Sequence, residues 1–352
     1  MKRITKLITI SAMCVFLVAG LSGCKSQAVG TEQQPAKEAE QTSVTWKLAT
    51  IRPEGTRTDV SARKFADDVN SITDGRIKIE IYPNSELGDY SVVQERISIG
   101  DIEMQLASVG QTVDKTLGVQ TAPYIVSNWE EAKTLYNTED GIIGTYVGER
   151  LEKQGIKLLA VYPQYFGAVA LAKEPKDPFN PDGMKDLKIR VPATNAWNEL
   201  GKGLGFMTTP LPASEIFTSL QTGVIDGAIG AGSESYYTQY KELVKYVMPI
   251  KYHFECHWLY MNKEKWDNLS ADDQKNIMEI AKKLEASAFE QAESEESKYD
   301  ELFKAEGTTV YEFTDEQISA YADKIRNQVW PKIEADYGKE IFDQIKEAVG
   351  LN

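Results

Sequence analysis

The order of strand-like and helical segments between residues 44 and 110 is the feature that most constrains the fold. VTWKLATI, RIKIEIYP and IEMQLAS have the composition of strands, and the segments between them, DVSARKFADDVNSIT and DYSVVQERISIG, have that of helices. This alternation predicts an α/β sheet with mainly parallel strands. The pattern recurs in GIKLLAVYP, VALAKEP, KIRVP, NAWNELGKGLG, ASEIFTSLQTG and VIDGAIG, so we expect two α/β units.

A long helix is expected after these units. Residues 270–305 contain neither proline nor glycine, and Ser270 with Asp273 resembles a capping box. At 1.5 Å per residue such a helix would be roughly 50 Å long, which exceeds the width of one domain of about 110 residues. We therefore expect it to span both units. A strand at TTVYEF and two terminal helices broken at Pro331 are expected to follow.

The first residues have the features of an export signal. Basic residues precede an apolar run over residues 7–21, and LSGC follows it. LSGC resembles a bacterial lipobox, in which cleavage precedes Cys24 and the thiol receives lipid; the alternative is an ordinary signal peptide with a chance cysteine. Residues 1–23 are therefore interpreted as a lipoprotein signal peptide and 24–43 as a flexible linker. The globular part is expected to begin near Val44.

Charge and cysteine content exclude two classes of protein. With 53 acidic and 39 basic residues the formal charge is −14, and loss of residues 1–23, which carry three positive charges, would give −17. A nucleic-acid partner is not expected for so acidic a chain. Cys14 would leave with the signal and Cys24 would carry lipid, so Cys256 has no partner and a disulfide scaffold is excluded.

The sequence offers little for catalysis. His253 and His257 are the two histidines, and no nucleophile elbow, phosphate loop or dinucleotide motif is present. In HFECHW, residues His253, Glu255 and His257 could align on one face of a strand and bind a divalent metal. Hydrogen-bonded packing histidines are the favoured alternative, and acidic pairs such as Glu234 and Asp226 arise by chance in an acidic chain. We expect no catalytic residue, metal or cofactor.

Several motifs together resemble a known family. YPNSELG, ERISIGDIEM, TAPYI, DLKIRVP, LPASEIFTSLQTGVIDG and MNKEKWDNLS are similar, in order and spacing, to the solute-binding proteins of tripartite ATP-independent periplasmic (TRAP) transporters, the DctP family. The resemblance implies a clamshell of the periplasmic-binding-protein type, with two α/β domains, crossing strands and a long helix spanning both domains. The first domain would comprise 44–165 plus 254–293, and the second 166–253 plus 294–352.

The resemblance also assigns a role to Arg190. In the family the arginine of the KIRVP-like strand binds the ligand carboxylate, and a guanidinium fork matches a carboxylate geometrically. The alternative is an ion pair between the domains. Other candidate ligand contacts are residues near strand ends and loops: Gln164, Tyr165, Tyr124, Trp197, Glu215 and Tyr236. Their competing roles are those of turn, core and helix-capping residues.

The chain departs from the family in two segments. In PQYFGA, Gln164 stands at an Asn position and Gly167 at an Arg position, and Gly230 replaces an Asn in DGAIGAG. These changes remove polar anchors, and glycines are expected to leave space. A dicarboxylate or a sialic-acid-like sugar would lose partners for its polar groups. We therefore expect a monocarboxylate with an apolar or aromatic body, such as a 2-oxo or hydroxy acid.

The expected function is that of a receptor without catalytic activity. It would be extracytoplasmic, attached to the cell membrane by lipid, and would deliver a small organic carboxylate to TRAP membrane permease subunits. The alternatives are a binding protein of an ABC importer or a ligand-sensing receptor, and then a metal-dependent or glycoside hydrolase.

Overall fold

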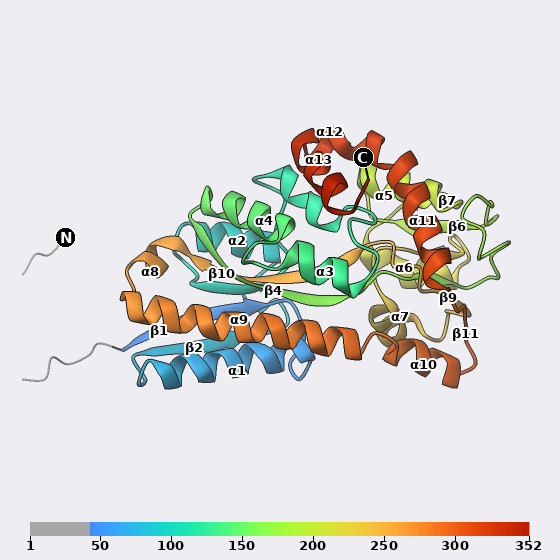
Figure 1. Cartoon of the computed structure of the whole chain (residues 1–352). Helices are drawn as coiled ribbons and strands as arrows, with labels where there is room; N and C mark the ends of the chain where they lie inside the picture. The colour runs from blue at the N-terminus through green and yellow to red at the C-terminus, as the bar shows by residue number, and fades with distance from the viewer. Residues whose placement is uncertain (1–42, 352) are drawn as a thin grey trace, which may run out of the picture. The chain divides into compact units, whose positions relative to one another are not determined.

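The structure is a computed structural model that describes residues 43–351, so the predicted signal peptide, most of the linker and Cys24 lie outside the described residues. The described part of the chain contains two β-sheets with helices packed on them (Figure 1). The predicted α/β class is confirmed, whereas the exact domain boundaries stay a prediction. Within residues 43–351 no helix has the length and apolar character needed to cross a membrane.

Five strands form the first sheet, in the order β2-β1-β3-β10-β4. They are β1 (Val44–Thr50), β2 (Ile77–Tyr82), β3 (Met104–Ala107), β4 (Ile156–Phe166) and β10 (Phe254–Asn262). β1 pairs in parallel with β2 and β3, as predicted, whereas β10 is antiparallel to β3 and β4. β10 runs in the opposite direction because the chain re-enters the first sheet at the end where β4 leaves it.

Helices cover both faces of the first sheet. α1 (Arg57–Ile72) and α9 (Ala271–Ser294) lie side by side on one face (Figure 1). The remaining helices of this part are α2 (Tyr90–Ser98), η1 (Lys115–Thr121), α3 (Trp129–Tyr136), α4 (Ile142–Glu152) and α8 (Lys263–Asp267). Alternate residues of β10 belong to different cores: Leu259 and Met261 pack with α1 and α9, and Trp258 and Tyr260 pack with α2, α3 and α4.

Six short strands form the second sheet, in the order β11-β9-β5-β8-β6-β7. They are β5 (Val169–Leu171), β6 (Lys188–Val191), β7 (Met207–Pro210), β8 (Gly227–Ala228), β9 (Tyr246–Met248) and β11 (Thr309–Val310). The helices of this part and of the C-terminal segment are α5 (Asn195–Gly203), η2 (Ala213–Glu215), α6 (Ile216–Gln221), α7 (Ser233–Tyr240), α10 (Lys298–Ala305), α11 (Asp315–Gln328), α12 (Trp330–Tyr337) and α13 (Lys339–Ala348).

Two adjacent crossings connect the sheets. β4 leads into β5 through Gly167 and Ala168, and β9 leads into β10 through residues 249–253. The two crossings are hydrogen-bonded to each other, because the Gly167 amide donates to the His253 carbonyl at 2.9 Å. Residues at this point therefore belong to neither sheet alone and lie where both meet.

The prediction of a single helix over residues 270–305 is wrong in one respect. It is divided into α9 and α10 by a turn at residues 295–297. α9 packs on β4, whereas α10 packs on α7 and β11, so the two helices together serve both sheets. Tertiary contacts hold the turn: Glu295 pairs with Arg57 at 3.7 Å, and Glu296 pairs with Lys251 at 2.9 Å. Such contacts cannot be read from helical periodicity.

Asp273, in the first turn of α9, is predicted to stabilise the folded protein measurably. Its carboxylate accepts two hydrogen bonds of 2.7 Å from Arg76, at the end of the α1–β2 loop, and these bonds lower the pKa of Asp273. Asp273→Asn should therefore reduce the free energy of unfolding by about 2 kcal/mol at pH 7. The deficit should shrink as the pH falls from the unfolded-state pKa of about 3.9 through the lower folded value.

Urea denaturation at pH 7 and at acidic pH measures both effects. The control is Asp272→Asn, which changes the exposed neighbouring carboxylate in the same helical turn and should cost under about 1 kcal/mol. Equal losses in the two variants at pH 7 would contradict the importance of the Arg76 contact.

Candidate functional site

Arg190 lies in β6, and main-chain carbonyl groups hold its side chain. Its Nε donates to the Leu211 carbonyl at 2.8 Å, and its Nη1 donates to the Ile229 carbonyl at 3.1 Å. The residue is only 6% exposed, and burial lowers the pKa of the guanidinium. Within residues 43–351 no carboxylate lies at ion-pair distance from it. The interdomain ion pair considered as the alternative is therefore not formed by the described residues.

The two carbonyl contacts leave part of the Arg190 guanidinium available. A guanidinium has five N–H groups, and the contacts use one on Nε and one on Nη1. The second N–H of Nη1 and one of Nη2 can together bind a carboxylate in parallel. A buried charge without a counter-ion is unfavourable, so an anion at this edge would offset the cost of burying the arginine.

The loop Ile229–Gly232 joins this guanidinium to two buried tyrosines. The Tyr252 hydroxyl accepts from the Gly230 amide at 2.8 Å and donates to the Ala231 carbonyl at 3.0 Å. The Tyr236 hydroxyl accepts from the Ala231 amide at 3.2 Å. Tyr236 thus positions the loop, and its own hydroxyl group is already engaged.

An aromatic cluster lies at the crossing between the sheets. We define it as Tyr165, Trp197, Tyr252 and His253. The His253 ring stacks on Tyr252, with centroids 4.9 Å apart, and meets Trp197 edge-on at 5.0 Å and Tyr165 at 6.4 Å. Of the predicted contacts, Tyr165 and Trp197 are therefore brought together.

The expectation that glycines leave space is wrong at both positions. A Cβ on Gly167 would lie 2.1 Å from Nδ1 of His253, so the imidazole occupies the space that a side chain there would need. A Cβ on Gly230 would lie 2.9 Å from Nη1 of Arg190 and from Pro192, and Gly230 has φ +111°. Both glycines are places of close packing and add no cavity.

Gln164 is held by residues of α1, β10 and the loop after β1. Its Nε2 donates to Thr58 Oγ1 at 3.1 Å and lies 3.1 Å from His257 Nδ1, and its Oε1 accepts from Arg52 at 3.5 Å. Burial lowers the pKa of His257 to about 3, with a further contribution from Arg52. His257 is therefore neutral at physiological pH and can accept from Gln164.

Tyr124 and Glu215 occupy different environments. Tyr124 is fully buried and its hydroxyl donates to the Ile250 carbonyl at 2.6 Å, which is a packing role. Glu215 is exposed at the end of η2 and makes no hydrogen bond through its carboxylate with the described residues. Their proposed roles as ligand contacts stay predictions.

The histidines of HFECHW do not form a metal centre with the described residues. The register between β10 and β4 shifts between Glu255 and Cys256, where β4 carries the extra residue Gln164, and no group of three His, Cys, Asp or Glu side chains in residues 43–351 could hold a metal ion. His257 contacts Gln164 whereas His253 belongs to the aromatic cluster. The two rings therefore lie in different surroundings.

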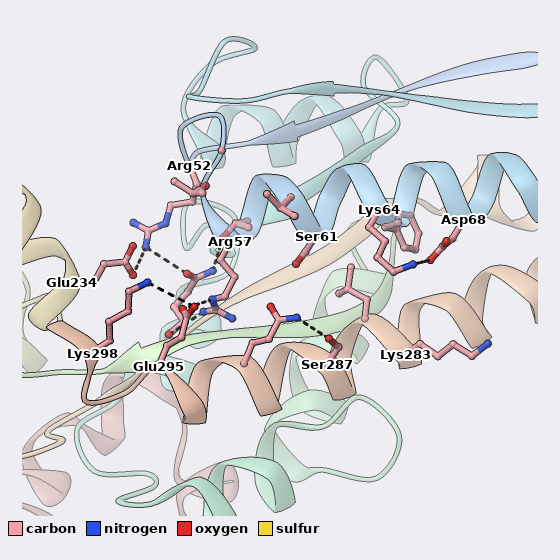
Figure 2. A pocket seen from close by; sticks show the side chains of 18 of the residues that line it. Arg52, Arg57, Ser61, Lys64, Asp68, Glu234, Lys283, Ser287, Glu295 and Lys298 are labelled. Carbon is pink, nitrogen blue, oxygen red and sulfur yellow. Dashed lines mark hydrogen bonds and ion pairs between the residues drawn. The ribbon is translucent and has the colours of Figure 1, made fainter.

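A separate groove of about 750 Å³ lies between α1 and α9, close to α7 and α10 (Figure 2). Its charged side chains are largely paired with one another: Arg52 with Glu234 at 3.4 Å, Arg57 with Glu295 at 3.7 Å and Lys64 with Asp68 at 2.7 Å. Gln164 lines the groove but Arg190 does not. An anion entering the groove would compete with these carboxylates for the basic side chains. At Arg190 no carboxylate of the described residues competes.

Sequence reasoning missed the roles of Tyr252, Arg52 and the His253 ring. Tyr252 joins the loop that receives Arg190 to the aromatic cluster, and Arg52 links the first sheet to Glu234 of α7. Neither residue lies in a recognisable motif. The available signal was glycine at position 167, where the resembled family has arginine. Another side chain, here that of His253, had to fill the space.

Comparison with known proteins places these features in context. Residues 48–336 match the DctP family, described as bacterial extracellular solute-binding protein, family 7. A solute-binding protein of Roseobacter denitrificans is 28% identical over 244 residues, which cover 68% of this chain and 72% of that protein.

Solved structures show the same fold. A TRAP periplasmic solute-binding protein from Ochrobactrum anthropi has a TM-score of 0.78 and 23% identity, covering 89% of this chain and 98% of that one. Another from Haemophilus influenzae, with bound L-gulonate, has a TM-score of 0.71 and 23% identity, covering 86% and 99%. The two-sheet arrangement of residues 43–351 is therefore an established one.

Close packing at Gly167 yields a prediction. Gly167→Ala should displace the His253 ring and lower the free energy of unfolding by about 1–3 kcal/mol, measured by urea denaturation. Gly148→Ala, inside α4, is the control. Its methyl group would meet Leu158 at an ordinary 3.4 Å, so this variant should be neutral or stabilised by up to about 1 kcal/mol. Unchanged stability in Gly167→Ala would refute the packing argument.

Proposed function

The chain belongs to the DctP family of bacterial extracellular solute-binding proteins, and from this premise we propose that it binds a monocarboxylate with an apolar or aromatic body. It is a TRAP-type solute-binding receptor, and the family is one of receptors and not of enzymes. In our proposal the bound acid is delivered to the membrane permease subunits of the transporter.

One observation carries the carboxylate assignment. Arg190 is buried, its Nε and one Nη1 hydrogen are fixed by carbonyl groups, and its remaining edge has no acidic partner among the described residues. Two carbonyls fix the orientation of the fork before any ligand arrives, so little conformational entropy is lost on binding. A carboxylate supplies both the charge and the two parallel acceptors that this edge lacks.

The surrounding residues favour a body with few polar groups. The neighbouring surfaces are the rings of Trp197, Tyr165 and Tyr252, and glycine stands at positions 167 and 230 where a polar side chain was expected. The Haemophilus influenzae structure carries L-gulonate, an acid with several hydroxyl groups. Such a body would bury hydroxyl groups here with few partners, at about 1–3 kcal/mol for each unsatisfied group.

Closure around the two crossings provides the receptor's signal. The chain passes between the sheets at residues 167–168 and 249–253, and rotation there would change the separation of the sheets. A ligand that contacts Arg190 on one side and the first sheet on the other stabilises the closed form in proportion to its differential affinity. The permease would then recognise that form.

Replacement of Arg190 tests the proposed contact. Arg190→Lys retains the charge but loses the planar fork, so affinity for a bound carboxylate, measured by calorimetry, should fall tenfold or more, an order-of-magnitude effect. Arg63→Lys, an exposed arginine of α1, is the control and should leave affinity unchanged. Equal affinity of Arg190→Lys and the unmodified protein would return Arg190 to a purely structural role.

We further propose that the receptor is extracytoplasmic and is tethered through lipid on Cys24, which lies outside the described residues. Cys24→Ala in the full chain should abolish incorporation of radiolabelled palmitate and move the protein from the detergent phase to the aqueous phase on Triton X-114 partition. Retention of the label in that variant would exclude Cys24 as the site of attachment.

A further inference from the structure

His253 is a buried polar side chain that has no hydrogen-bond partner in the part of the chain that the structure describes. It is 1% exposed, and neither ring nitrogen is hydrogen-bonded to any described residue. Buried polar groups nearly always have partners, so an unsatisfied imidazole at the junction of two sheets requires an explanation. The ring is fixed by Tyr252, Trp197 and the close approach of Gly167, and it has no room to turn toward another acceptor.

The carboxylate of Glu255 lies just beyond hydrogen-bond distance of the His253 ring. Nε2 of His253 lies 3.6 Å from Oε2 of Glu255, which is too long for a hydrogen bond. The other oxygen, Oε1, accepts from the Ser108 hydroxyl at 3.2 Å. Burial acts to raise the pKa of Glu255, but the neighbouring His253 ring and the Ser108 hydroxyl outweigh it and lower that pKa. Oε2 is therefore an available acceptor of an ionised carboxylate.

The His253–Glu255 pair lies close to the predicted carboxylate site at Arg190. Tyr252 connects the two, because its hydroxyl bonds the loop that receives Arg190 and its ring stacks on His253. The Glu255 side chain is 20% exposed, so a ligand atom can reach its carboxylate from that side. A small acid bound at Arg190 would extend toward the pair across the width of one ring.

We propose that His253 and Glu255 recognise a hydroxyl group of the ligand, and hence that the receptor selects a hydroxy monocarboxylate. This rests on the proposed function. A hydroxyl group can donate to Oε2 of Glu255 and accept from Nε2–H of His253 at once, and an oxygen beside two atoms 3.6 Å apart can lie within hydrogen-bond distance of both. Both unsatisfied groups then acquire partners.

Two other substituents fit less well. A 2-oxo group only accepts hydrogen bonds, so it would place its oxygen against the Glu255 carboxylate without a proton between them. An ammonium group only donates, so Nε2 would have to lose its proton to Nδ1. Nδ1 faces Gly167, where no acceptor among the described residues is available.

Matched acids that differ in one substituent test the inference. Calorimetry of the full mature protein would compare four acids with the same phenyl body: 3-phenyllactate, phenylpyruvate, 3-phenylpropionate and phenylalanine. It would also include the isomer of 3-phenyllactate that carries its hydroxyl group at C3, and the corresponding acids with a methyl body. The hydroxy acid should bind at least tenfold tighter than the oxo, deoxy and amino acids of the same body. Glu255→Gln, whose amide can donate to a carbonyl, should reduce this preference and favour the oxo acid relative to the hydroxy acid.

His253 variants provide the second arm. His253→Phe fills the same space without a donor and should weaken only the hydroxy acid, whereas His253→Gln retains an N–H near the position of Nε2 and should recover part of the preference. The thermal midpoint of each unliganded variant shows whether it folds. If His253→Phe does not fold, the near-isosteric Glu255→Gln variant still tests the inference.

The outcomes separate this inference from the proposed function. Equal binding of hydroxy and deoxy acids, with both weakened by Arg190→Lys, would overturn the inference and leave the function standing. Tightest binding of the amino acid would also overturn it. Binding of none of these acids would overturn both.

Discussion

The burial of one guanidinium that has no counter-ion among residues 43–351 is the constraint on which the candidate site depends. Arg190 is taken out of water by β6 and its neighbours, and carbonyl groups of Leu211 and Ile229 fix its direction. Carbonyl dipoles compensate a buried charge only in part, so the folded protein carries an unfavourable term that an anion would remove. Glycine at 230 is needed because any larger residue would collide with this guanidinium.

The second constraint is the close contact between the two crossings. The Gly167 amide donates to the His253 carbonyl, and the imidazole of the same histidine covers the face of Gly167. Residues distant in sequence are therefore coupled at the point about which the proposed closure would rotate the sheets. A side chain that lies at this point senses both sheets, which is the position from which ligand contacts bias a two-state closure.

Much of the fold could be predicted because it follows from local patterns. The strands VTWKLATI and RIKIEIYP and the capped start of α9 at Ser270 depend on periodicity and on cap chemistry. The turn at residues 295–297 could not, since it depends on Arg57 and Lys251 from distant elements. Likewise the proposed role of Arg190 came from its motif, whereas the filling of the Gly167 space by His253 requires knowledge of which chain segments cross.

The most direct test of the account is a crystal structure of the protein with an acid identified by thermal-shift screening. We predict that the carboxylate oxygens lie within hydrogen-bond distance of Nη1 and Nη2 of Arg190, while Nε remains bonded to the Leu211 carbonyl. A carboxylate bound instead in the groove between α1 and α9, against Arg52 or Arg57, would contradict it.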